Sequence, residues 1–135
     1  MHELEPYSTT LPVKRARSMA YDGCHYYLTS PQLCDCSCNI HKLNSRFHQV
    51  DIISATRPYT CLCYDSAERC FWASCDNNAA YIYKLTADFI ETDRISIANA
   101  ATPVRSISHD CAHNTLIVAY DDHIAEVLAH RTSRT

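Results

Sequence analysis

The sequence predicts an all-β chain made of three four-stranded antiparallel propeller blades, which together would form half of a propeller. The first observation is a repeat. An Asp follows an aromatic or His residue three times, and an Ile opens a matching segment three times, 42 residues apart. These markers are Asp22, Asp65 and Asp110, and Ile40, Ile82 and Ile124. A period in the low forties, built from short strands, is typical of propeller blades.

The second observation is composition. The repeated segments are short and rich in Tyr, Ile, Val, Thr, Phe and Cys, which favours strands over helices. We expect strands at 16–22, 24–30, 39–44 and 47–53, then at 59–65, 69–75, 79–86 and 89–97, then at 104–110, 115–121 and 123–130. The chain then divides into an arm (1–14), blade 1 (15–57), blade 2 (58–102), blade 3 (103–130) and a tail (131–135). The fourth strand of blade 3 is missing.

The third observation is the alternation of side chains in the first strand of each blade. One face carries small residues and the other carries large ones, because successive side chains point to opposite faces of a strand. The small set is Ser18, Ala20, Cys61, Cys63, Ser106 and Ser108, and the large set is Met19, Tyr21, Leu62, Tyr64, Ile107 and His109. We therefore expect the small face of one blade to pack on the large face of the next. The repeated Asp residues are expected to close the turns between first and second strands.

Composition narrows the class of protein. The formal net charge of −3 gives no basic excess that would indicate nucleic acid. The longest strongly apolar run, Thr115 to Tyr120, is far too short to span a bilayer, and the N-terminus lacks the apolar core of a signal peptide. We therefore expect a cytoplasmic protein with no membrane contact. The nine cysteines are then interpreted as reduced thiols that act as small apolar side chains.

Three blades do not close a ring, since propellers have four to eight. An open half-ring would expose two large apolar faces, which monomers rarely tolerate. We therefore expect two chains, related by a two-fold axis, to form one six-bladed ring. The arm 1–14 could add as the missing strand, with Pro6 limiting it to an edge position.

The repeated segment resembles blades of the six-bladed propeller group that includes NHL-repeat and calcium-dependent phosphotriesterase-like proteins. It also looks like short bacterial proteins of unknown role with Cys-rich blades. The resemblance covers about residues 15 to 130. It rests on Tyr64, Asp65, Phe71, Trp72, Ile82, Lys84, Leu85 and Phe89. The Trp-Asp dipeptide of WD repeats is absent, and so is a convincing set of Glu, Asn and Asp metal ligands like that of the phosphotriesterase-like enzymes.

Two sets of residues are candidate sites. The first set is Arg17, Arg57 and Arg105, which lie where the chain passes from one blade to the next. A ring of guanidinium groups there would suit an acidic ligand or peptide. The alternative is ordinary surface charge paired with Asp and Glu. Cys34, Cys36 and Cys38 could hold zinc together with His25 or His41. The alternative there is a reduced or redox-labile loop.

No catalytic residue is identifiable, because no Ser, Cys or Asp stands in a recognisable nucleophile context. The sequence therefore favours a binding or interaction module over an enzyme. Two alternatives remain open. One is a metal-dependent hydrolase of the phosphotriesterase or lactonase type, and the other is a truncated propeller fragment without a role of its own.

Overall fold

The computed structural model describes residues 10, 15–31, 38–75, 78–97 and 102–129. Its eleven strands form three antiparallel sheets with the orders β1-β2-β3-β4, β5-β6-β7-β8 and β11-β10-β9, which we call blades 1, 2 and 3. The strands of blade 1 are β1 (Ser18–Tyr21), β2 (Tyr26–Pro31), β3 (Cys38–Leu43) and β4 (Gln49–Ala55). Those of blade 2 are β5 (Tyr59–Asp65), β6 (Cys70–Cys75), β7 (Asn78–Leu85) and β8 (Glu91–Ser96). Those of blade 3 are β9 (Ser106–Asp110), β10 (Thr115–Ala119) and β11 (Ile124–Leu128).

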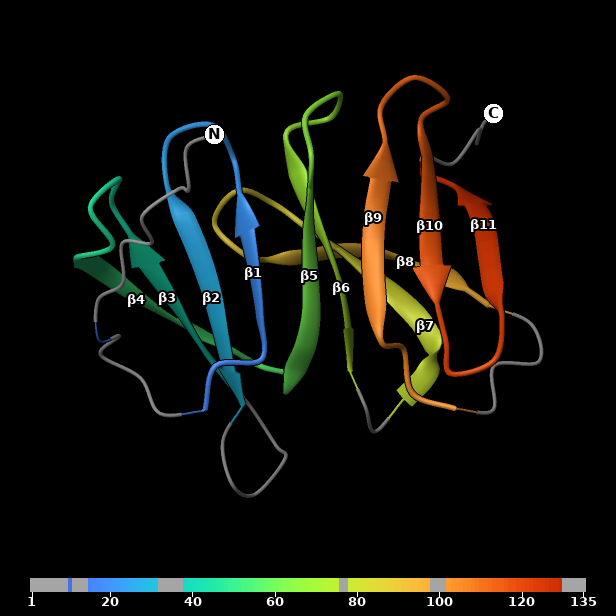
Figure 1. Cartoon of the computed structure of the whole chain (residues 1–135), viewed down its shortest axis with the longest axis horizontal. Coiled ribbons are helices and arrows are strands. Elements are labelled where there is room, and N and C mark those ends of the chain that lie inside the picture. The colour runs from blue at the N-terminus through green and yellow to red at the C-terminus, as the bar shows by residue number, and fades with distance from the viewer. Residues whose placement is uncertain (1–9, 11–14, 32–37, 76–77, 98–101, 130–135) are drawn as a thin grey trace, which may run out of the picture.

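The blades are arranged side by side through their first strands. Strands β1, β5 and β9 contact one another in turn, and the later strands of each blade lie farther out (Figure 1). Every expected strand is present within a few residues of its expected limits, so the predicted three-blade, all-β architecture is confirmed. Blade 3 has three strands among the described residues, also as expected. The arm 1–14, apart from Thr10, and the tail 131–135 lie outside them.

The predicted packing of small faces on large faces is also confirmed. Ala20 of blade 1 and Leu62 of blade 2 belong to one buried cluster, and Cys61 and Cys63 share a second cluster with Ile107 of blade 3. The small residues allow contacts with the neighbouring backbone. The Ser18 hydroxyl accepts a hydrogen bond from the Leu62 amide at 3.1 Å. Several cysteines are therefore explained by close packing between blades.

The repeated Asp residues close the turns between first and second strands, as predicted. In each turn the carboxylate accepts hydrogen bonds from the amides two and three residues ahead, at 2.8 to 3.4 Å. The only glycine of the chain, Gly23, lies in the first of these turns with a φ of 99°, so the other two turns depend on Asp without a glycine. Among the described residues, no His, Cys, Asp or Glu side chains gather in a group of three that could hold a metal ion.

The recurrence of Phe in blades 1 and 2 has a structural explanation. Phe47 and Phe89 occupy the same position in the β3–β4 and β7–β8 turns, and both have positive φ angles, of 65° and 64°. Each amide donates to the carbonyl three residues earlier, from Asn44 and Thr86 respectively. Positive φ is unfavourable for a bulky residue, so packing of the ring must stabilise the turn.

Candidate functional site: the outer faces of blades 1 and 3

Positions that are equivalent in the repeat differ sharply in exposure. Ile40 and Ile82 are 0% exposed, whereas Ile124, at the same place in blade 3, is 69% exposed. In the first strands, Leu62 and Ile107 are 4% and 6% exposed, whereas Met19 of blade 1 is 51% exposed. The difference follows from position in the array, because among the described residues no other blade packs on the large face of blade 1 or on the small face of blade 3. On the large face of blade 1, Leu28 and His41 are nevertheless buried, while Met19 is exposed.

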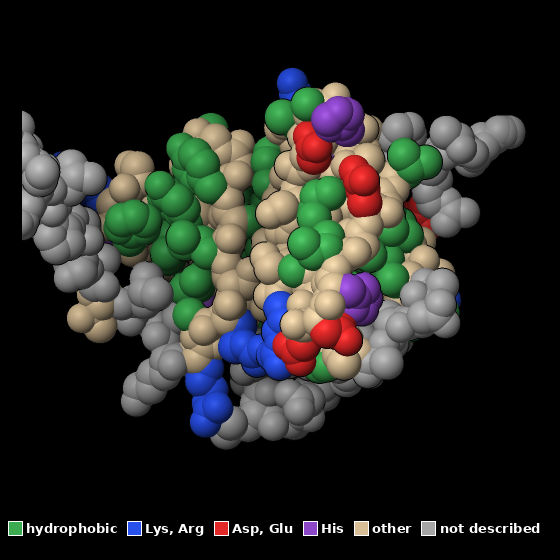
Figure 2. All heavy atoms as spheres, turned by 45° about the vertical axis from the view of Figure 1, so that its right-hand side comes forward, with side chains coloured by type: hydrophobic (Ala, Val, Ile, Leu, Met, Phe, Trp, Pro, Cys, Tyr) green, Lys and Arg blue, Asp and Glu red, His purple; other side chains and the backbone are tan. Residues whose placement is uncertain are grey.

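We call these two surfaces, on which no other described blade packs, the outer faces. Met19, Tyr21 and Ile52 lie on the outer face of blade 1, and Ile124 and Leu128 lie on the outer face of blade 3. Figure 2 turns blade 3 forward and shows hydrophobic side chains in the middle of this side, with charged groups towards its ends. Exposed apolar surface of this extent is typical of a contact surface.

The outer face of blade 1 carries an aromatic ladder. Tyr21 stacks on Tyr26 with ring centroids 4.6 Å apart, and Tyr26 contacts Phe47 at 5.0 Å. Blade 2 has the same ladder on the equivalent face, formed by Tyr64, Phe71 and Phe89 with centroid distances of 5.1 and 4.4 Å. The blade 2 ladder is covered by blade 1, and the blade 1 ladder is half exposed.

One side chain of the preceding blade inserts into the covered ladder. The ring of Tyr27 lies 4.9 Å from Phe71 and 5.2 Å from Phe89, measured between centroids. Trp72 is the equivalent residue of blade 2 and is buried in the cluster shared with blade 3. Ile117 is the equivalent residue of blade 3, since it pairs with Ser108 as Tyr27 pairs with Ala20. We call these three residues the knobs.

Two of the knobs are tied to the Asp turn of their own blade. The Tyr27 hydroxyl donates to Asp22 at 3.0 Å, and the Trp72 Nε1 donates to Asp65 at 3.1 Å. Both Asp65 and the side chain of His109, whose Nε2 lies 3.4 Å from the Asp65 carboxylate, are almost fully buried, at 0% and 4% exposed. A carboxylate and an imidazole closed off from solvent in this way stabilise the junction and are not accessible to a substrate.

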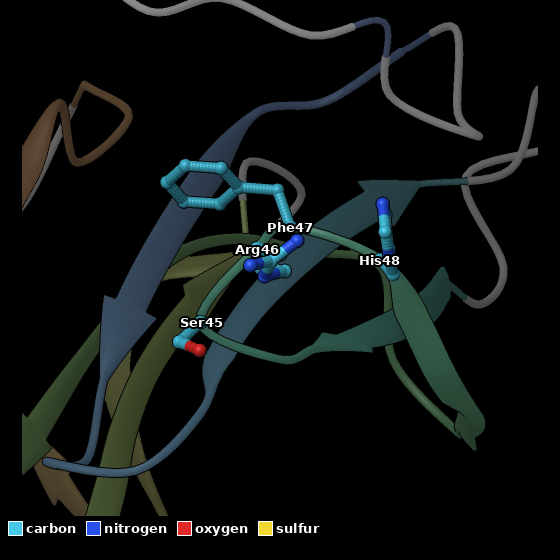
Figure 3. A pocket seen from close by; sticks show the side chains of 4 residues that line it. All are labelled: Ser45, Arg46, Phe47 and His48. Atoms are coloured by element: carbon cyan, nitrogen blue, oxygen red, sulfur yellow. The ribbon is translucent and has the colours of Figure 1, made fainter.

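A shallow pocket of about 370 Å³ lies beside the ladder, where the β3–β4 turn supplies Ser45, Arg46, Phe47 and His48 (Figure 3). In Figure 3 the side chains of Phe47 and His48 point to opposite sides of this turn. Arg46 and His48 are exposed, and the Arg46 guanidinium gives this end of the blade 1 face a positive charge.

Two of the three predicted Arg residues are paired with carboxylates. The Arg57 Nε donates to Glu91 at 2.6 Å, and its guanidinium lies 4.2 Å from the Tyr83 ring centroid. The Arg105 Nε donates to Asp121 at 2.6 Å, and a second nitrogen reaches the other oxygen at 3.4 Å. The Glu91 hydrogen bond raises the pKa of Arg57, and the Arg105 hydrogen bond lowers the pKa of Asp121. Arg17 is exposed. The pairs match the surface-charge alternative, and anion binding stays a prediction.

The predicted zinc ligands are only partly described. Cys34 and Cys36 lie outside the described residues, and Cys38 is a buried residue of β3. Burial raises the pKa of the Cys38 thiol to about 11, which disfavours the thiolate that binds zinc. Of the other two predicted partners, His41 is buried, with its Nδ1 2.7 Å from the Gln49 side-chain oxygen, and His25 lies in the blade 1 Asp turn.

The sequence did not lead us to expect Ile117, Glu126 and Arg46 as candidate contact residues of the outer faces. Their signal was present, because aligning the three repeats places Ile117 with Tyr27 and Trp72, and Glu126 with Lys42 and Lys84. The exposure of these positions depends on whether another blade packs on them, which the residues of a single repeat do not encode.

Comparisons with known proteins support the fold class. Neither a protein-family model nor a curated protein matches the chain. Solved structures that resemble it include the WD40 β-propeller domain of Doa1, with a TM-score of 0.59 and 12% identity over 84% of this chain. Another is hydrazine synthase of Kuenenia stuttgartiensis, with a TM-score of 0.56 and 10% identity over 87% of the chain.

The chain spans about a third of the length of these structures, namely 37% and 32%. At such low identity the likeness concerns the fold alone, and it establishes a β-propeller-like arrangement. It does not single out the NHL or phosphotriesterase-like group. Among the described residues, no helix is long and apolar enough to cross a membrane.

Proposed function

We propose that the chain is a β-propeller interaction module whose working form is a ring of six blades, closed by a second copy of the same chain. The observation that carries the proposal is the exposure of Met19 and Ile124, whose repeat equivalents Leu62 and Ile82 are buried between blades. The described part of the chain therefore has a large face on blade 1 and a small face on blade 3 that carry exposed apolar residues and match the two sides of its own internal junctions.

A two-fold ring fits this pair of faces. Blade 3 of one copy would pack on blade 1 of the other, and the reverse contact would close the ring. Both outer faces would then be buried at two identical junctions. Binding is favoured over catalysis because Asp65 and His109, the most buried titratable pair among the described residues, lie inside a junction where a substrate cannot reach them.

The experiment is the solution mass as a function of concentration. Sedimentation or light scattering should find twice the chain mass of 15.3 kDa at micromolar protein, with concentration-dependent dissociation below that. A folded protein that stays at 15.3 kDa at high micromolar concentration would refute the ring.

A further inference from the structure

We infer that Ile117 of one copy inserts against the Tyr26 and Phe47 rings of the other copy, with Glu126 facing Arg46 across the junction. This inference rests on the proposed ring and specifies its register. It follows from the internal junction, where the equivalent knob Tyr27 contacts Phe71 and Phe89 at 4.9 and 5.2 Å.

The acceptor side is already formed in blade 1. Tyr26 and Phe47 are 5.0 Å apart, as a ladder that repeats the Phe71 and Phe89 pair of blade 2. Both blades hold the Phe in the same strained turn, with φ near 65°. A half-exposed ladder whose Phe47 is fixed by this strained turn can receive a knob with little rearrangement.

The small face of blade 3, which supplies the knob Ile117, can approach the ladder of the second copy closely. Ile117 lies between Ser108 on β9 and Glu126 on β11, just as Tyr27 lies between Ala20 and Lys42. The neighbouring small positions, Ser106 and Ser108, are exposed. At the internal junction the equivalent Ser18 bonds the Leu62 amide, so Ser106 is expected to bond the backbone at Met19 of the second copy.

Charges at the edge of the junction fit the same register. Lys42 lies 5.9 Å from the Tyr27 centroid, and Asp88 precedes Phe89, so positive and negative side chains flank the internal contact. At the proposed junction the equivalent positions carry the opposite charges. Glu126 stands in the place of Lys42 beside the knob, and Arg46 stands in the place of Asp88 before the Phe of the turn. The exchange keeps the charges complementary and favours a second copy over an unrelated apolar surface.

The test measures the dimer dissociation constant of variants by sedimentation. Ile117→Asp should raise it about a hundredfold or more, because a carboxylate would be desolvated against aromatic rings beside Glu126. Ile90→Asp is the matched control, since Ile90 is 62% exposed on blade 2 outside both outer faces, and it should leave the constant unchanged.

A charge exchange tests the register independently of any folding defect. Glu126→Arg and Arg46→Glu should each weaken the dimer about fivefold, and the double variant should return it close to the wild-type constant. A wild-type dimer that tolerates Ile117→Asp, or a double variant no tighter than the singles, would overturn this register while the ring stands. A monomeric wild type would overturn both proposals.

Discussion

Blade 2 and blade 3 follow the same strand and turn pattern but differ in what covers them. Blade 2 packs against a neighbour on each face, so Trp72 and Ile82 are almost fully buried. Blade 3 is covered on one face. Ile117 is therefore half-buried and Ile124 is exposed, although they occupy the repeat positions of Trp72 and Ile82 respectively. Equivalent repeat positions are therefore buried or exposed according to whether another described blade packs on them.

The largest expected difference between a covered junction and the exposed surface is in the reactivity of the cysteine thiols. Burial raises the pKa of Cys63 to about 12 from 9.0, so its thiolate should be about a thousandfold rarer in the folded chain than in the unfolded chain. Labelling with a thiol reagent, followed by peptide mass spectrometry, should modify exposed Cys24 and Cys111 quickly and Cys63 only after unfolding. Rapid labelling of Cys63 in the folded protein would contradict the closed junction between blades 2 and 3.

The raised pKa of Cys63 also predicts that the stability of the fold depends on pH. Because the folded pKa of Cys63 lies above its unfolded value, the folded state keeps a proton that the unfolded state loses. The contribution to stability is complete below pH 9.0 and declines as the pH rises towards 12. The pKa of Cys70 is also raised to about 12 by burial and acts in the same direction. Urea unfolding at pH 8 and pH 10 should show the loss, and an unchanged midpoint would speak against it.

Two isoleucines give a matched comparison of packing. Ile82→Ala should lower the free energy of unfolding by about 2–5 kcal/mol, because it leaves a cavity between blades 2 and 3. Ile124→Ala, at the equivalent position, should change it by less than about 0.5 kcal/mol in the monomer. Both values come from urea unfolding at protein concentrations where only monomer is present. Equal losses there would show that Ile124 is not on an uncovered face.

The Asp turns give a smaller contrast. Asp65→Ala should lower stability by about 2–3 kcal/mol, because the buried Trp72 indole and two partly buried turn amides lose their acceptor. Asp110→Ala removes the equivalent turn contacts, but its partners are exposed to water, so the loss should stay below about 1 kcal/mol. A comparison by thermal unfolding measures both, and a larger loss for Asp110 would reverse the expected order.

Much of the fold could be predicted from the sequence because the information is local and repeated. Asp22 and its equivalents, the alternation along β5 and the two Phe turns each occur more than once, so chance matches are improbable. The three strands that blade 3 has among the described residues were predicted in the same way. These features depend on turn chemistry and side-chain alternation, which act over a few residues.

The site was less predictable, for physical reasons. The expected Arg group depends on where long side chains point, and two of them are held by acids distant in sequence, Glu91 and Asp121. The ladder depends on pairing Tyr21 with Tyr26 and then with Phe47 across a turn. No pattern in the sequence marks such long-range choices, although the internal repeat of blade 2 offers a template for them.

The smallest expected effect concerns the predicted anion site. The Arg105 guanidinium already contacts Asp121 through two nitrogens, so a free anion must compete with a fixed carboxylate. Asp121→Asn removes this competitor, and Asp122→Asn, a neighbouring exposed carboxylate beside His123, makes the same change of net charge and serves as the control.

If Arg105 binds anions at the blade handover, phosphate should bind about tenfold more tightly to Asp121→Asn than to Asp122→Asn, a difference of about 1.4 kcal/mol. Titration with inorganic phosphate, followed by calorimetry or NMR shifts, measures both constants. Adding Arg105→Gln to Asp121→Asn should remove the gain, because Gln supplies no charge and no paired donors. Equal phosphate affinity for the two Asn variants would mean that the Arg105 pair is surface charge, which contributes little to stability and nothing to binding.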